Sequence, residues 1–276
     1  MSMPVEQNNH SISLQTRVLI SLRYKTITKA INREFWNSSS DTANSFYVGS
    51  YGRGTAVDTS DLDVLVELPN DQYDRFNSPY GNGPSRLLQT VKNAVLKSYP
   101  RSDVKGDGQV VVINFSDGIK FEILPAFRKL SYIGIWDGTY KYPDTHMGGN
   151  WMSTNPKAEQ KAMKEKNGFN ESNGLLYDTC KHIRYIHNEH FSSYHLSGIL
   201  IDSFVYKAIG NWHWDRDNYE TGGSERGDYE RILLNYYNAI SLMNAYVNPI
   251  LYAPGSNMIV KGDDWDILGK VLNYIV

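Results

Sequence analysis

The stretch from Asp61 to Leu68 constrains the fold most, because acidic and apolar side chains alternate along it. In a strand, successive side chains point to opposite faces. Asp61 and Asp63 therefore share one face, while the apolar residues at positions 62, 64, 66 and 68 fill the other. Two carboxylates about 7 Å apart along a rigid strand repel each other unless a cation lies between them. Because Mg²⁺ prefers carboxylate oxygens and leaves positions for phosphate, the pattern indicates a strand that carries a metal site.

Two further features favour that interpretation over a solvated surface, which is the commoner context of two acids on a strand. A turn of small residues, Gly49-Ser50, lies ten residues upstream of Asp61, and its backbone N–H groups and hydroxyl suit phosphate oxygens. Glu122 lies between apolar neighbours in a predicted strand, where an acid is costly unless it faces a ligand or a cation. Three carboxylates from neighbouring strands are what a two-metal site needs. We therefore expect Asp61, Asp63 and Glu122 to form one.

Hydrophobic periodicity divides the chain into a first half with strands and a second half of helices. In the first half we expect a long helix, two strands, a polar loop, a helix, a hairpin and an irregular Gly-rich segment, at 12–36, 46–48, 61–68, 70–85, 87–99, 109–127 and 131–151. In the second half we expect helices at 156–166, 173–190, 196–210, 224–247 and 264–275. The fold class is thus α+β, with a catalytic domain over 1–155, a helical domain over 156–276 and a central cleft between these two lobes.

Composition excludes several classes of protein. A net charge of −2 argues against a constitutive DNA binder, which would be basic. The single cysteine, Cys180, excludes an intrachain disulfide and fits a reducing cytoplasm. The first ten residues are polar, so a secretory signal is not expected, and the chain has no apolar run of membrane-spanning length. We therefore expect a cytoplasmic protein with no membrane partner.

Other polar side chains are interpreted as surface groups. Glu67 shares the face of Asp61 and Asp63 but lies farther along the strand, so we expect it to be solvated. The histidines of the helical half lack the helical His-x-x-x-His pair of a zinc site and are expected on a surface helix and its loop, namely His182, His187, His190 and His195.

The combined motif resembles that of the polymerase-β-like nucleotidyltransferase superfamily. Val48-Gly49-Ser50 is followed by Asp61-Leu62-Asp63-Val64, and Glu122 stands as the third acid. The added Arg53-Gly54-Thr55 is similar to the branch that holds cyclic GMP-AMP synthase, oligoadenylate synthase and the bacterial CD-NTases of CBASS anti-phage systems. Trp151-x-x-Thr154-Asn155-Pro156 also looks like that bacterial group.

This resemblance implies an enzyme that condenses nucleoside triphosphates, whether ATP, GTP or pyrimidine nucleotides, into a cyclic di- or trinucleotide and releases pyrophosphate. It implies a palm with a long N-terminal helix, two Mg²⁺ or Mn²⁺ ions held by the three acids, and a separate effector protein that the product activates. Four residues of the motif are expected to bind the nucleotide: Gly49, Ser50, Arg53 and Thr55.

The resemblance extends more loosely into the helical half. Related enzymes place a helical lysine and serines of the next helix on the triphosphate. Here Arg184 stands where Lys is usual, with Lys181 one turn earlier as the competing candidate. Ser197 matches the first serine, and Gly198 replaces the second. A guanidinium binds phosphate bidentately and an ammonium as a point charge, so this change alters geometry while it keeps charge. An ordinary helix surface is the alternative interpretation of these residues.

Three alternative functions stay open at this point. The first is a linear oligonucleotide synthase. The second is transfer of a nucleotide to a protein or to tRNA, although the enzymes of that type are typically smaller and lack a large helical half. The third is an inactive nucleotide-binding module, against which the presence of all three acids argues.

Overall fold

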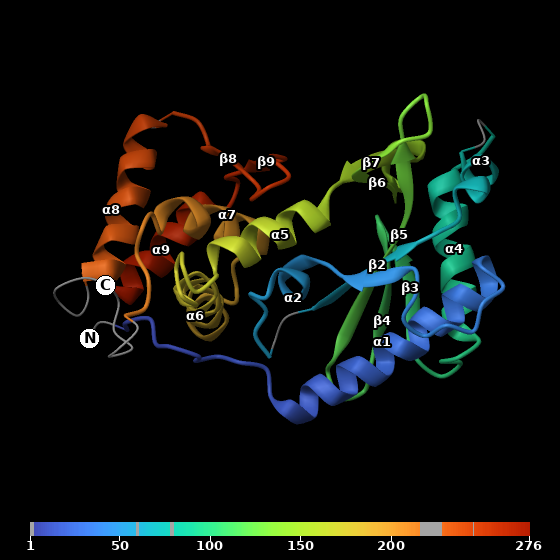
Figure 1. The fold of residues 1–276 in the computed structure, drawn as a ribbon, viewed down its shortest axis with the longest axis horizontal. Coiled ribbons are helices and arrows are strands. Elements are labelled where there is room, and N and C mark those ends of the chain that lie inside the picture. The colour runs from blue at the N-terminus through green and yellow to red at the C-terminus, as the bar shows by residue number, and fades with distance from the viewer. Residues whose placement is uncertain (1–2, 59–60, 78–79, 216–227, 245) are drawn as a thin grey trace. The chain divides into compact units, whose positions relative to one another are not determined.

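A computed structural model describes residues 3–58, 61–77, 80–215, 228–244 and 246–276 (Figure 1). The chain divides into two compact units, of which one comprises 13–52 and 61–156 and the other comprises 1–12, 53–60 and 157–276. We call them the sheet unit and the helical unit and describe each by itself. Within the described residues, no helix is long and apolar enough to cross a membrane.

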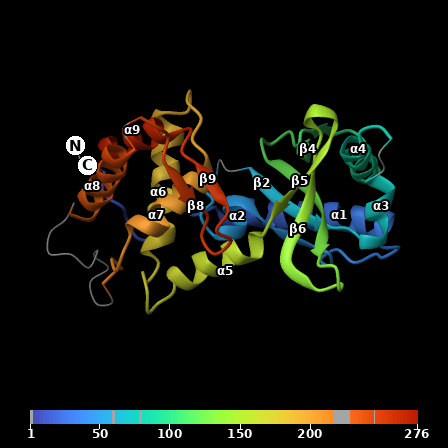
Figure 2. The ribbon, with the colours of Figure 1, turned by 90° about the horizontal axis from the view of Figure 1, so that it is seen from above.

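The sheet unit is organised around one mixed sheet, in which seven strands are described. The strands are β1 Ser45–Tyr47, β2 Leu62–Glu67, β3 Asp103–Asp107, β4 Val110–Asn114, β5 Lys120–Leu130, β6 Trp136–Asp144 and β7 Asn150–Thr154. Their order is β1-β2-β5-β4-β3, and β6 joins the far end of β5 and pairs with β7. Only β2 and β5 are parallel among these pairs; β5 and β6 run side by side as an antiparallel pair (Figure 2).

Strand register separates an apolar face of this sheet from a polar one. Leu62 lies beside Phe121 and Val64 beside Ile123, and all four side chains are buried. Asp63 lies beside Glu122, so both carboxylates are on the opposite face because side chains alternate. The sheet therefore presents Asp63 and Glu122 away from its apolar face.

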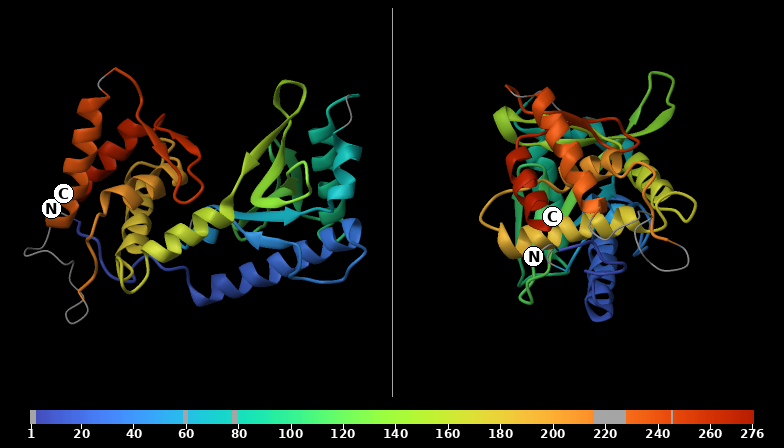
Figure 3. Two further views of the ribbon diagram at one scale, coloured as in Figure 1. Left: turned by 45° about the horizontal axis from the view of Figure 1, so that its top comes forward. Right: turned by 90° about the vertical axis from the view of Figure 1, so that its left-hand side faces the viewer.

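Helices α1 and α4 pack against each other and against the strands (Figures 1 and 3). Helix α1 spans Leu14–Phe35 and begins at Ser13, whose hydroxyl accepts a hydrogen bond from Thr16 N. Helix α4 spans Gly83–Leu96, and the Asn82 side chain accepts from Ser85 N. An added Cβ at Gly106 of β3 would lie 3.4 Å from Leu88 of α4, which places α4 over the apolar face. In α1 Ile27 and Ile31 are buried, whereas Leu14, Val18 and Leu22 in the first half of the helix are exposed.

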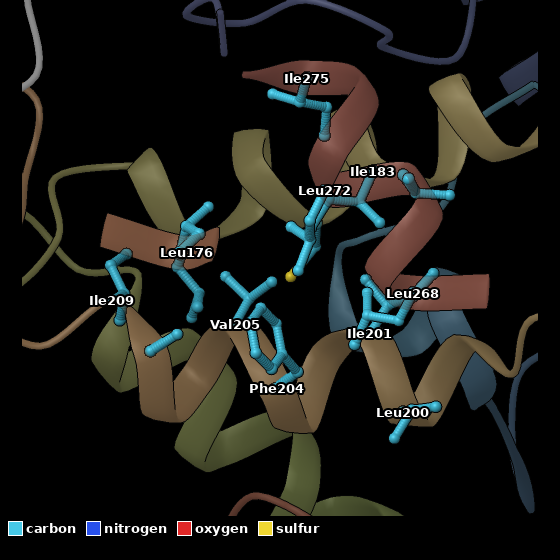
Figure 4. Close-up of a cluster of buried hydrophobic side chains, with 14 of the residues drawn as sticks. Leu176, Ile183, Leu200, Ile201, Phe204, Val205, Ile209, Leu268, Leu272 and Ile275 are labelled. Carbon is cyan, nitrogen blue, oxygen red and sulfur yellow. The ribbon is translucent and has the colours of Figure 1, made fainter. Parts of the chain in front are cut away.

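The helical unit consists of α5 Pro156–Lys166, α6 Leu175–His190, α7 Gly198–Ala208, α8 Asp228–Met243 and α9 Trp265–Ile275, with a small hairpin of β8 Ile250–Tyr252 and β9 Ile259–Lys261. Helix α7 is apolar on nearly every side, which is typical of a buried helix. Its Phe204 and Val205 pack among side chains of α6 and α9, including Leu176, Ile183, Leu268 and Leu272 (Figure 4).

The α+β fold class is confirmed, and so is each long helix, apart from the ends of the one predicted at 224–247, which include positions outside the described residues. Two predictions about shorter elements are wrong. The segment 131–151 is not irregular, because β6 and β7 complete their hydrogen bonds there with β5 and with each other. The polar loop 70–85 contains a 3-10 turn, Asn70–Gln72, and a short helix α3, Tyr73–Phe76. In addition, strand β3 and the β8–β9 hairpin were not predicted.

Candidate active site

The Gly49-Ser50 turn is built directly against Asp63. Val48 N donates a hydrogen bond of 2.8 Å to Asp63 O, which fixes the turn beside β2. Gly49 has φ +57°, and a Cβ at this position would overlap the Asp63 carboxylate. Only glycine satisfies both the left-handed backbone and the close approach. Helix α2, Gly49–Arg53, begins at this glycine, and Ser50 is its second residue. The Asp63 carboxylate lies directly against Gly49.

Asp61 and Glu122 meet on the ammonium group of Lys120. Lys120 Nζ lies 2.8 Å from Asp61 Oδ2 and 2.6 Å from Glu122 Oε1. Solvent reaches the cluster, because the exposed fraction of the side chain is 33% for Lys120, 49% for Asp61 and 26% for Glu122. Lys120 begins β5 two residues before Glu122 and therefore shares its face.

Opposing effects act on the pKa of Lys120. Partial burial lowers it, while the hydrogen bonds and charges of Asp61 and Glu122 raise it, and the net direction is upward from the ordinary value. The lysine is therefore positively charged at neutral pH, and it compensates two of the three acids of the predicted site.

The donor set of this face fits a hard divalent ion, although the side chains are arranged around an ammonium. Asp61, Asp63 and Glu122 offer carboxylate oxygens from two hydrogen-bonded strands, and the positive group between two of them shows that the position attracts a cation. Among the described residues, however, no three carboxylate, imidazole or thiol groups converge closely enough to hold an ion. Binding of an ion by all three acids would therefore require side chains to move.

Arg53 and Thr55, which were predicted to bind nucleotide, lie in a buried ionic cluster of the helical unit. Arg53 Nε donates to Asp202 Oδ2 at 2.7 Å, and its Nη1 donates to Glu159 Oε2 at 3.2 Å. Thr55 Oγ1 donates to the same Asp202 oxygen at 3.1 Å. Arg53 is 7% exposed, and Thr55 and Asp202 are 0% exposed. Their role in binding a nucleotide stays a prediction; what the structure describes is a structural role.

Arg184 joins the same cluster from α6. Its Nη1 forms an ion pair of 2.7 Å with Asp202 Oδ1, and its Nη2 donates to Gly198 O at 2.8 Å. Burial alone would raise the pKa of Asp202, but the two guanidinium groups hold it below its ordinary value. Burial raises the pKa of Glu159 in spite of Arg53. Asp202 is thus an ionised group fully enclosed between two arginines.

The other two predicted ligands of the helical half lie outside this cluster. Ser197 precedes α7 and is half-buried; its N–H, not its hydroxyl, is bonded to Asp264 Oδ2, at 3.0 Å. Lys181 is half-buried on α6. Neither observation bears on phosphate binding, so the assignment of Ser197 and Lys181 as nucleotide ligands stays a prediction.

Glu67 corrects one expectation about this sheet. It is 8% exposed, pairs with Arg128 Nε at 2.7 Å and accepts a hydrogen bond from Tyr140 at 3.1 Å. The prediction of a solvated side chain is wrong because β5 and β6 extend beyond the end of β2 and cover it. The surface position expected for His182 is likewise wrong, because its side chain is 4% exposed and its Nε2 is hydrogen-bonded to Met3 O at 2.8 Å.

Sequence reasoning missed Lys120 and Asp202. The signal for Lys120 was present, because its spacing of two from Glu122 puts both on one face. Asp202 lies in the run Ile-Leu-Ile-Asp-Ser-Phe-Val, where an acid in an apolar helix implies a buried partner. Nothing in the local sequence says that the partners are Arg53 and Arg184.

The chain is similar to known proteins both in its family profile and in its fold. The profile of the Second Messenger Oligonucleotide or Dinucleotide Synthetase (SMODS) domain matches residues 6–167. Among solved structures, the Elizabethkingia meningoseptica CdnE cyclic dinucleotide synthase with GTP and Apcpp matches with a TM-score of 0.60 and 14% identity over 99% of this chain and 93% of that one.

Two further structures match over similar lengths. The Rhodothermus marinus CdnE c-UMP-AMP synthase gives a TM-score of 0.63 and 14% identity over 96% and 91% of the two chains. The Bradyrhizobium diazoefficiens CD-NTase CdnG in complex with GTP matches with a TM-score of 0.65 and 13% identity over 95% of this chain and 85% of that one. At these identities the likeness establishes the fold. No curated protein sequence matches the chain significantly.

Proposed function

The chain belongs to the SMODS family and is a nucleotidyltransferase, and we propose that it condenses nucleoside triphosphates into a cyclic di- or trinucleotide second messenger. The observation that supports the proposal is that Asp63 and Glu122 lie beside each other on two hydrogen-bonded strands, with Asp61 directly before the first strand and the Gly49-Ser50 turn against Asp63. The nucleotides bound in the related CdnE and CdnG structures support triphosphates as substrates.

The reaction joins a ribose hydroxyl oxygen to the α-phosphorus of a triphosphate, while the bond between the α-phosphorus and the bridging oxygen breaks and pyrophosphate leaves. Bound Mg²⁺ or Mn²⁺, two ions per site in our proposal, would lower the pKa of the hydroxyl and offset the charge of the leaving group. Asp61, Asp63 and Glu122 would hold these ions. Glu122 accepts the proton of the attacking hydroxyl, and Ser50 with the adjacent backbone N–H groups binds the terminal phosphates.

Cyclisation requires a second transfer in the same site. The linear intermediate must present its free hydroxyl to its own 5′-triphosphate, so one set of acids serves both steps. A linear oligonucleotide synthase would instead add a further nucleotide. Transfer to a protein or tRNA, and binding without turnover, are the remaining alternatives.

The test is to incubate the protein with all four nucleoside triphosphates and Mg²⁺ or Mn²⁺, and to identify the products by mass spectrometry after phosphatase treatment. A phosphatase-resistant cyclic product with pyrophosphate release is the expected result. A phosphatase-sensitive ladder would identify a linear synthase, and product only when tRNA or protein is present would identify a modifying enzyme.

Substitutions assign the site. Asp61→Asn combined with Asp63→Asn, and separately Glu122→Gln, should lower pyrophosphate release by at least about 100-fold, which is the lower end of what a general base contributes. Asp71→Asn, an exposed acid of the same unit, is the matched control and should keep full activity. Wild-type rates in the double variant would refute the assignment of the site.

We also propose the cellular role that the family suggests, anti-phage signalling through an effector protein that the cyclic product activates. The experiment is phage challenge of bacteria that express the chain with its neighbouring genes. Protection should be lost with the Asp61→Asn, Asp63→Asn variant and kept with Asp71→Asn.

A further inference from the structure

Lys120 occupies the position at which Asp61 and Glu122 would share a cation. Its Nζ lies within hydrogen-bond distance of one carboxylate oxygen of each, at 2.8 and 2.6 Å. Asp61 precedes the Leu62–Phe121 pair of the parallel strands, so it is level with Lys120 in the register. The contact therefore follows from the backbone pairing and is not a chance meeting of long side chains.

An ammonium and a divalent ion cannot share this position. Mg²⁺ binds carboxylate oxygens at about 2.0–2.1 Å, so an ion held by Asp61 and Glu122 would lie between the oxygens that Lys120 now contacts. Two positive charges there would also repel each other. The absence of a convergent acid cluster among the described side chains is consistent with this, because Lys120 stands between two of the acids.

We propose that Lys120 is an internal counter-ion of the active site, which compensates Asp61 and Glu122 in the free protein and which a divalent ion displaces on binding. This inference rests on the proposed function, since it takes the three acids as metal ligands. A third of the lysine side chain is exposed, and its stem has four rotatable bonds, so it can leave without a change of backbone. Lys120 is thus a positioning residue that determines the affinity of the site for its metal ion.

The inference predicts a gain of metal affinity when the charge is removed. In Lys120→Met, Mn²⁺ no longer competes with a tethered cation and should bind about 30-fold more tightly, because a unit charge about 4 Å from a divalent ion changes binding by this order even in a high-dielectric medium. Without metal, the same variant should have a lower melting temperature, because Asp61 and Glu122 lose their shared counter-ion. Saturating Mn²⁺ should abolish this difference in melting temperature, because the bound ion replaces the lost counter-ion.

The experiment measures Mn²⁺ binding to the full chain, with no nucleotide, by titration calorimetry and by the electron paramagnetic resonance signal of free Mn²⁺. Lys120→Gln accompanies Lys120→Met in case the latter folds poorly. Lys120→Arg keeps the charge and should bind Mn²⁺ as the wild type does. Lys25→Met removes an exposed lysine of α1 in the same unit and is the matched control, with unchanged affinity expected.

The outcomes separate this inference from the proposed function. If wild-type Mn²⁺ binding depends on Asp61 and Asp63 but Lys120→Met and Lys120→Gln bind no more tightly, the counter-ion role is overturned and the metal site stands. If Mn²⁺ binding is insensitive to Asp61→Asn with Asp63→Asn, both are overturned. The inference is supported if Lys120→Met and Lys120→Gln bind Mn²⁺ more tightly than the wild type while Lys120→Arg and Lys25→Met do not.

Discussion

Asp202 offers the strongest test of how the helical unit is held together. It is 0% exposed and lies between two guanidinium groups, with Arg53 Nε and Arg184 Nη1 each at 2.7 Å. Asp202→Asn keeps the shape of the side chain but removes the charge, which leaves two buried arginines with only Glu159 as an acidic partner in the described cluster. Loss of one partner from a buried ion pair costs about 3–5 kcal/mol. This is a large part of the 5–15 kcal/mol that is typical of a folded domain.

The measurement is equilibrium unfolding in urea, followed by the fluorescence of the tryptophans and by circular dichroism. Because the chain has two compact units, the two probes are analysed separately and a two-state fit is used only where their transitions coincide. Asp263→Asn, an exposed acid of the same unit, should change the free energy of unfolding by less than about 0.5 kcal/mol. A loss below about 1 kcal/mol for Asp202→Asn would refute the view that this ionised carboxylate is what neutralises the two arginines.

Two further predictions concern the turn and a buried histidine. Gly49→Ala should cost about 1–2 kcal/mol for the left-handed backbone and should also reduce pyrophosphate release, since its Cβ would overlap Asp63; Gly118→Ala, with φ +89° and open space, should show the backbone cost alone. Burial lowers the pKa of His182 to about 4 from 6.5, so the folded state resists its protonation and stability falls as pH drops from 6.5 towards 4. Between pH 7 and pH 5 the free energy of unfolding, measured in urea, should fall by about 2 kcal/mol less in His182→Gln than in the wild type.

The sequence predicted the parts of this fold whose cause is local. The long helices follow from apolar residues at helical spacing, and β2 follows from alternation of Asp61 to Leu68. β6 was missed although Trp136, Tyr140 and Tyr142 recur at even spacing, because Gly138 and Pro143 within it are typical of loops. It is a strand because β5 and β7 supply its hydrogen bonds. β3 is short, and of its residues only Val104 is buried, so it too depends on a neighbour.

The same distinction applies to the site. Period-two spacing was sufficient to put Asp61 and Asp63 on one face, because strand geometry fixes side-chain direction along a strand. It could not place Glu122 beside Asp63, because that depends on the register of a second strand. It could not show that the Lys120 ammonium lies between two of these acids, which depends on the register of β5 beside β2. Nor could it show that Arg53 and Thr55 turn to Asp202, which lies more than a hundred residues away in the chain.

The two departures from the family pattern in the helical half are explained together by one contact. The resemblance implies a lysine at the position of Arg184 and a second serine at that of Gly198, and nothing in the sequence links the two positions. In the structure Arg184 Nη2 donates to Gly198 O at 2.8 Å and would lie 3.1 Å from any Cβ at position 198. A serine there would press on the guanidinium, whereas glycine leaves room for its wider fork. Arg184 and Gly198 therefore belong together in the packing between α6 and α7. The guanidinium is held by its ion pair with Asp202, and the absence of a side chain at position 198 leaves space for it.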